Sequence, residues 1–197
     1  MKIIHVTDTH FIPAGQTLYG RDPATALERC IADINRNHPD AERCVITGDL
    51  THWGEPEAFD HLKQHLDQLK VPLRLLVGNH DNRDIFRQRF GDHPCDENGF
   101  IQSVEDLPVG RFIYLDTNKP GHHEGWYCEQ RMQWLEEQFA AAKGKDLYLF
   151  MHHPPFDIGI PALDRISLVQ KGAFSEVVKP HRDQIRHLFF GHIHRPL

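Results

Sequence analysis

Cysteine is scarce in this sequence, and its arrangement excludes the sites that cysteine usually builds. The 197 residues contain four cysteines, and no two of them form a Cys-x-x-Cys pair. Neither a zinc ribbon nor a thioredoxin-like redox motif is therefore indicated. Cys30 and Cys44 fall on the apolar faces of expected elements, so we interpret both as small core residues.

Long hydrophobic runs and an excess of positive charge are also missing. No apolar run reaches the length of a membrane span, and polar residues interrupt the first apolar run too early for a signal peptide. The net charge of −6 gives no general attraction to nucleic acids or anionic membranes. We therefore expect a cytoplasmic protein that binds neither nucleic acid nor a membrane.

Histidine is the residue that the sequence has in excess, with 16 copies. It is also the commonest ligand for transition metals in proteins. The rest of the composition, 40% hydrophobic and 25% charged, is that of an ordinary globular protein. The length suffices for one domain with a substantial core, so we expect residues 1–197 to form a single domain.

Short apolar runs alternate with helical patterns along the first part of the chain. Helices are expected from Pro23 and from about Pro56, each after a short apolar run, and a short helix is expected at 85–90 after the third run. Three successive strand-then-helix units predict a parallel sheet with right-handed crossovers. A further helix is expected at 129–142, and the expected strands are 2–7, 43–47, 73–77, 101–104, 111–115, 147–151 and 185–190, of which 101–104 and 111–115 begin a second sheet.

Five of these strands end in side chains that bind metal ions. The carboxyl ends of parallel strands meet at one edge of a sheet, so we expect these groups to converge. Taken singly each has an ordinary explanation, such as a turn cap for Asp8 or a solvated loop acid for Asp49. Their repetition at five strand ends favours a shared site. The groups are Asp8 and His10, Asp49, Asn79 and His80, His152, and His192 and His194.

The chemistry of this set indicates two metal ions. Oxygen and imidazole ligands without a thiolate suit Mn, Fe, Co or Zn better than Ca. The set exceeds what one tetrahedral ion requires, so one carboxylate would be shared between two ions. Two ions about 3.5–4 Å apart can activate water as hydroxide, neutralise phosphate oxygens and hold an ester for in-line displacement.

Five motifs, in this order, resemble the signature of the calcineurin-like metallophosphoesterases, and they span almost the whole chain. The resemblance implies a four-layer α/β/β/α sandwich of two mixed sheets flanked by helices. The Asp-Thr-His opening and the Leu18-Tyr19-Gly20 loop look most similar to the bacterial class III cyclic-nucleotide phosphodiesterase and glycerophosphodiesterase subgroup. The motifs are Asp8-x-His10, Gly48-Asp49, Gly78-Asn79-His80-Asp81, His152-x-Pro154 and Gly191-His192-x-His194.

Carried over by motif, the resemblance also implies roles for the site residues. His80 would lie near the leaving-group oxygen, stabilising charge or donating a proton, and Asp81 would orient it. Phe11 and Tyr19 are candidates for lining the substrate pocket. Asp49 would bridge two ions, with Asp8, His10 and His194 completing one site and Asn79, His152 and His192 the other.

The implied activity is hydrolysis of a small phosphodiester, such as a cyclic nucleotide or a glycerophosphodiester, by metal-bound hydroxide. A phosphomonoesterase or nuclease would use the same ions, and a metal-free interaction scaffold would keep the same fold. Such proteins normally continue beyond Gly-His-x-His, often with a tail used for dimerisation or for capping the pocket. Because this chain stops at Leu197, we expect either a truncated sequence or a smaller second sheet. The natural diester, the native metals and a possible homodimer stay open.

Overall fold

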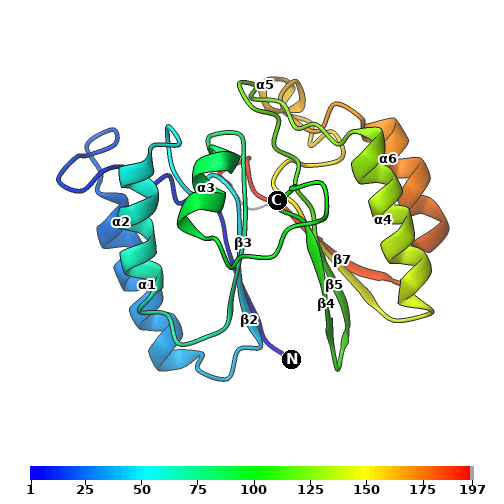
Figure 1. The fold of residues 1–197 in the computed structure, drawn as a ribbon, viewed down its shortest axis with the longest axis horizontal. Coiled ribbons are helices and arrows are strands. Elements are labelled where there is room, and N and C mark those ends of the chain that lie inside the picture. Colours follow the sequence, from blue (N-terminus) through cyan, green and yellow to red (C-terminus); the bar gives the residue numbers. More distant parts are fainter. Residues whose placement is uncertain (196–197) are drawn as a thin grey trace.

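Two β-sheets pack face to face between two layers of helices in the computed structural model (Figure 1). The structure describes residues 1–195, and Pro196 and Leu197, which the predicted domain includes, lie outside the described residues. The first sheet is parallel, with the order β1 (Ile3–Val6), β2 (Arg43–Thr47) and β3 (Leu73–Leu76). The second follows chain order through β4 (Ser103–Leu107), β5 (Gly110–Tyr114), β6 (Leu147–Phe150) and β7 (Ile185–Phe189).

Helices cover the outer face of each sheet. The first sheet carries α1 (Pro23–Asn37), α2 (Pro56–Leu66) and α3 (Arg83–Arg89), and the second carries α4 (Glu129–Ala142) and α6 (Lys171–Val178). The short α5 (Pro161–Asp164) and the 3-10 helix η1 (Lys179–His181) lie in connections. The predicted four-layer α/β/β/α arrangement is confirmed. Within residues 1–195, only the second sheet mixes strand directions, because β4 and β5 pair antiparallel.

The period of two along each strand explains this layering. In β2, Val45 faces the other sheet while Ile46 packs under the first helical layer. In β5, Phe112 likewise points between the sheets and Ile113 points toward α4. Strands buried on both faces have no polar side to alternate with, so they appear in the sequence as continuous apolar runs.

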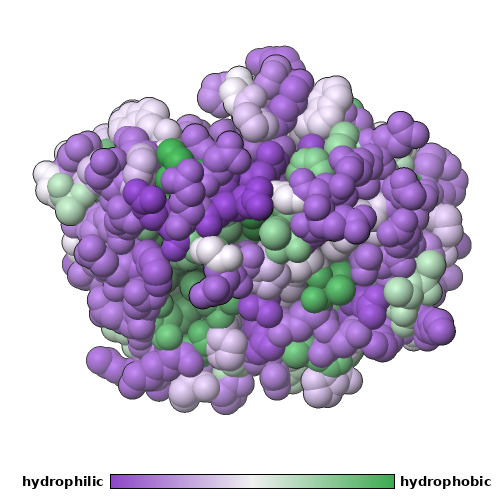
Figure 2. Space-filling model, viewed as in Figure 1, coloured by the Kyte–Doolittle hydropathy of each residue, from purple (hydrophilic) through white to green (hydrophobic). Residues whose placement is uncertain are grey.

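The surface is mostly hydrophilic on the face drawn in Figure 2, with apolar patches in the region between the two helical layers. No helix within residues 1–195 has the length and apolar character needed to cross a bilayer. Helix α6 was not expected from the sequence. It buries a single large side chain, Phe174, and so carries little of the periodicity that marks an amphipathic helix.

Candidate metal centre

The predicted ligands follow the carboxyl ends of five strands, and the backbone there is unusual. Seven non-glycine residues in the described part of the chain have positive φ, and five of them are predicted ligands. Positive φ is unfavourable for residues with a side chain, and such strain is typical of functional sites. The five are Asp8 (56°), His10 (45°), Asp49 (47°), His192 (71°) and His194 (51°).

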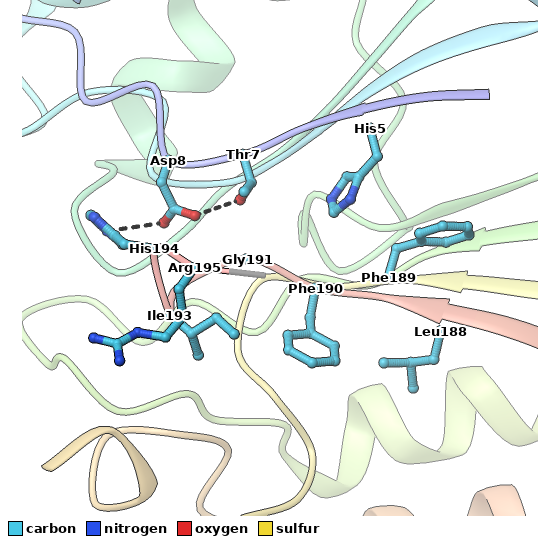
Figure 3. A pocket seen from close by; sticks show the side chains of 10 residues that line it. All are labelled: His5, Thr7, Asp8, Leu188, Phe189, Phe190, Gly191, Ile193, His194 and Arg195. Carbon is cyan, nitrogen blue, oxygen red and sulfur yellow. Dashed lines mark hydrogen bonds and ion pairs between the residues drawn. The ribbon is translucent and has the colours of Figure 1, made fainter. Parts of the chain in front are cut away.

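A first cluster of ligand atoms comes from Asp8, His10, Asp49 and His194. The Nε2 atom of His10 lies 3.0 Å from Nε2 of His194 and 3.7 Å from Oδ2 of Asp49. Figure 3 shows the Asp8 carboxylate between the His194 ring, 3.4 Å away, and the Thr7 hydroxyl, which donates to it at 2.8 Å. Ligand atoms of one zinc-type ion are about 3.0–3.5 Å apart. The spacings of 3.0 and 3.4 Å fit this range, and the 3.7 Å spacing lies slightly beyond it.

A second cluster surrounds the side chain of Asn79. Its Oδ1 atom lies 3.1 Å from Nε2 of His152 and 3.0 Å from Nδ1 of His192. The same Nε2 of His152 lies 3.3 Å from Oδ1 of Asp49. The two carboxylate oxygens of Asp49 therefore face different clusters, which is the geometry that a shared carboxylate requires.

The electrostatics of the centre favour bound cations. Burial opposes ionisation of Asp49, but the charge and hydrogen bond of His152 outweigh it and hold the pKa of Asp49 well below its usual range. Burial likewise disfavours a charged His152, yet Asp49 prevails and raises the pKa of His152 to about 9. The buried carboxylate thus requires a positive charge beside it.

The histidines of the centre also fit a metal. Burial lowers the pKa of His10 and that of His192 to about 4, so both rings keep a free lone pair at neutral pH. Nδ1 of His152 lies 2.8 Å from the carbonyl of Thr47, which can only accept, so a neutral His152 directs the Nε2 lone pair at Asp49 and Asn79. Metal-ligating histidines are commonly fixed by such a second hydrogen bond.

His153 lies beside the second cluster but is engaged elsewhere. Its Nδ1 is 2.7 Å from the hydroxyl of Thr117 and its Nε2 is 3.2 Å from the carbonyl of His123. Both ring nitrogens therefore already have protein partners. Of the adjacent pair, His152 is the one whose free nitrogen faces the centre.

His80 and Asp81 face in different directions from the same turn. Nδ1 of His80 donates to the carbonyl of His52 at 2.6 Å, and the ring lies 4.9 Å from that of His10. The Asp81 carboxylate accepts hydrogen bonds from Gly78 N, Leu50 N, Thr51 N and Thr51 Oγ1. No hydrogen bond among the described residues joins it to the His80 ring. Burial, followed by the charge of Asp49, raises the pKa of Asp81 to about 6.

Two loop residues that were expected to line the substrate pocket lie in different surroundings. Phe11 was expected in the pocket, but its side chain is fully buried in the core with α1 and α2, because the loop folds back onto the helices. Tyr19 is 87% exposed, and its ring lies 5.9 Å from that of His52. Sequence reasoning missed His52 itself, whose only signal is its position three residues after Asp49.

Comparisons with known proteins agree with this geometry. The sequence profile described as Calcineurin-like phosphoesterase matches residues 1–196. A probable cyclic nucleotide phosphodiesterase of Rhodopseudomonas palustris is 43% identical over 200 residues, covering 100% of this chain and 73% of that protein. A glycerophosphodiester phosphodiesterase of Enterobacter lignolyticus is 31% identical, with coverage of 98% and 71%.

A solved structure also resembles this chain. The purple acid phosphatase of yellow lupin (Lupinus luteus) superposes with a TM-score of 0.70 at 15% identity, covering 98% of this chain and 37% of that one. At this identity the likeness concerns the fold alone. It places the two packed sheets and their helices in a known architecture.

Proposed function

Since the chain belongs to the calcineurin-like phosphoesterase family and is a metal-dependent phosphoric diester hydrolase, we propose that its substrates are small diesters such as cyclic nucleotides or glycerophosphodiesters. The family resemblance predicted from the five motifs is confirmed. The relatives named above, a probable cyclic nucleotide phosphodiesterase and a glycerophosphodiester phosphodiesterase, support both substrate types. In this proposal, residues 1–197 act as one catalytic domain.

The observation that carries the proposal is the position of Asp49 between two clusters of ligand atoms. We assign Mn, Fe, Co or Zn to both sites, because the ligands are oxygens and imidazoles. When bound, two such ions polarise the phosphate and lower the pKa of the attacking water. One ion would be held by Asp8, His10, Asp49 and His194, and the other by Asp49, Asn79, His152 and His192.

His80 would act on the leaving group. Because its Nδ1 hydrogen is held by the carbonyl of His52, Nε2 is left to face the departing oxygen. With hydrogens on both ring nitrogens, the ring would donate the Nε2 hydrogen to the departing oxygen or stabilise its developing charge. Its own backbone N–H donates to Oδ1 of Asp49 at 3.0 Å, so the same residue also steadies the proposed shared carboxylate.

Asp81 would support this arrangement through the backbone. Its carboxylate accepts the N–H groups of Gly78, Leu50 and Thr51, which come from the two loops that present Asn79 and Asp49. Tying the loops together fixes the distance between these two groups. Asp81 therefore orients His80 through the turn that carries it.

The proposal is tested by turnover and metal content together. Protein reconstituted with Mn²⁺, Co²⁺ or Zn²⁺ is assayed on bis-p-nitrophenyl phosphate and p-nitrophenyl phosphate, then on 3′,5′- and 2′,3′-cyclic nucleotides and glycerophosphodiesters. We expect two ions per chain and faster cleavage of diesters. Faster cleavage of the monoester would favour a phosphomonoesterase, and neither ions nor hydrolysis would favour the scaffold alternative.

A matched pair of variants tests the ligand assignment. Asn79→Ala is expected to weaken the binding of one ion and to reduce turnover, because it removes the amide oxygen between His152 and His192. Asn37→Ala, at an exposed position of α1, is the control and should change neither quantity. Full activity of Asn79→Ala at limiting metal would contradict the assignment.

A further inference from the structure

His52 is a nearly buried histidine whose side chain has no part in the proposed mechanism. It is 9% exposed, and its ring contacts the rings of both His10 and His80. Its Nδ1 atom is 3.2 Å from Nδ1 of His10. Its ring stacks on that of His80, with centroids 4.8 Å apart and an angle of 20° between the planes.

The position of the ring hydrogen of His10 determines which of the two Nδ1 atoms, that of His10 or that of His52, is the donor in this contact. Nε2 of His10 faces the first cluster, so a metal bound there requires the ring hydrogen to be on Nδ1. That hydrogen needs an acceptor, because a buried N–H without one is costly. Among the described residues, the only hydrogen-bond partner of His10 Nδ1 is Nδ1 of His52.

The backbone holds His52 in place for this role. Its N–H donates to the carbonyl of Phe11 at 2.9 Å, and the N–H of Phe11 donates to Leu50 at 2.8 Å. The chain next to His10 is thus paired with the chain that carries His52. The His52 ring also packs against the Trp53 ring, with the ring centroids 4.4 Å apart. The acceptor atom, Nδ1 of His52, is therefore held in position by the fold itself.

We propose that His52 is a positioning residue for the metal centre: its Nδ1 accepts the Nδ1 hydrogen of His10 and so fixes the tautomer and rotation of that ring. Nε2 of His10 is then directed at Asp49 and His194. The inference rests on the proposed role of His10 as a metal ligand. It gives His52 a function that its spacing in the sequence does not reveal.

A pair of variants of equal shape tests the inference. Asn at position 52 keeps an acceptor near the place of Nδ1, whereas Leu has the same size without one. Titration calorimetry of metal-free protein with Mn²⁺ and with Co²⁺ measures the affinity of each site. We expect His52→Leu to weaken the binding of one ion about 10- to 100-fold. In His52→Asn the affinity for that ion should return to within a few fold of that of the unsubstituted protein.

Two measurements make the outcome unambiguous. Long-range ¹H–¹⁵N spectra of the unsubstituted protein should assign the hydrogen of a neutral His10 to Nδ1, and a hydrogen on Nε2 would overturn the inference even if no variant folds. Equal affinities in His52→Leu and the unsubstituted protein would overturn it as well, as would an Asn variant as weak as the Leu variant.

His10→Ala separates this inference from the proposed function. Unchanged binding of two ions by His10→Ala would remove His10 from the metal centre and refute both the positioning role of His52 and the ligand assignment made for His10 above, while diester hydrolysis is judged separately by the substrate panel. Loss of one ion in His10→Ala with no loss in His52→Leu would refute only the positioning role of His52. Loss in both variants, with recovery in His52→Asn, is the expected result.

Discussion

Gly78 is the position where one added methyl group tests the centre most directly. Its φ lies outside the left-handed region, so alanine is compatible with the backbone there. A Cβ on Gly78 would lie 2.2 Å from Oδ1 of Asp49, 2.4 Å from the Asp49 nitrogen and 2.8 Å from Nε2 of His152. Gly78→Ala therefore disturbs the metal centre without straining its own backbone conformation.

The size of the effect follows from these distances. Real Cβ contacts stay beyond 3.0 Å, so the Asp49 oxygen at 2.2 Å must move by about 0.8 Å. Metal–ligand distances tolerate only about 0.2 Å. Because Asp49 is assigned to both ions, we expect each to bind about 100-fold more weakly, at the upper end of the losses caused by displaced supporting groups. Overpacking adds a loss in unfolding free energy of about 1–3 kcal/mol.

Metal content after dialysis and titration calorimetry check this prediction, together with urea unfolding of the metal-free protein. Gly172→Ala is the control, since a Cβ there meets no atom within 4 Å and the site lies in α6. It should keep both ions and gain up to about 1 kcal/mol from helix propensity. Two ions bound with unchanged affinity by Gly78→Ala would refute the placement of Asp49 as the shared ligand.

Three further predictions concern single side chains. His80→Ala should keep both ions by elemental analysis while kcat falls about 10²- to 10⁴-fold, most for poor leaving groups; loss of an ion would instead make His80 a ligand. Arg83→Ala removes two hydrogen bonds, of 2.7 and 2.9 Å, from the fully buried carboxylate of Asp116. Urea unfolding should therefore show an unfolding free energy lower by about 3 kcal/mol, and a decrease below about 1 kcal/mol would contradict this prediction. His93 accepts the N–H of Leu75 at 3.1 Å, and burial lowers its pKa from 6.5 to about 4. Below pH 6.5 the unfolded chain therefore binds a proton that the folded chain does not, and stability should fall toward pH 4 by up to about 3 kcal/mol. His93→Gln keeps a hydrogen-bond acceptor but does not titrate. Urea unfolding of this variant between pH 7 and pH 4 should therefore show a smaller fall in the unfolding free energy, and a fall equal to that of the unsubstituted protein would contradict the prediction.

The convergence of the predicted ligands could be predicted because short apolar runs mark the strands that precede them. Leu147–Phe150 is a plain apolar run, and Leu73–Leu76 is apolar except for Arg74. Each strand ends just before a residue of the centre, His152 and Asn79 respectively. Parallel pairing then places these strand ends at the same edge of each sheet. The sequence thus contains both the residue types and the rule that gathers them.

Contacts of single side chains were not predictable in this way. The position of Phe11 depends on how a loop folds over α1 and α2, and no apolar pattern within the loop records that. Asp81 bonds to backbone groups of a loop about thirty residues away in sequence. The role of His52 depends on which nitrogen of His10 faces the first cluster. Such features follow from tertiary geometry, whereas sequence patterns report mainly which runs are buried.

The centre combines features that are unfavourable for the protein chain by itself. Asp49 is a carboxylate buried next to a second one, Asp81, whose pKa it helps to raise, and its own backbone has positive φ. His10 and His192 add further positive φ angles and buried, uncharged rings. Cations that bind only the folded chain offset these costs by mass action. The strain and the buried charge at the strand ends are therefore best explained as parts of a site whose stability depends on the ions that it binds.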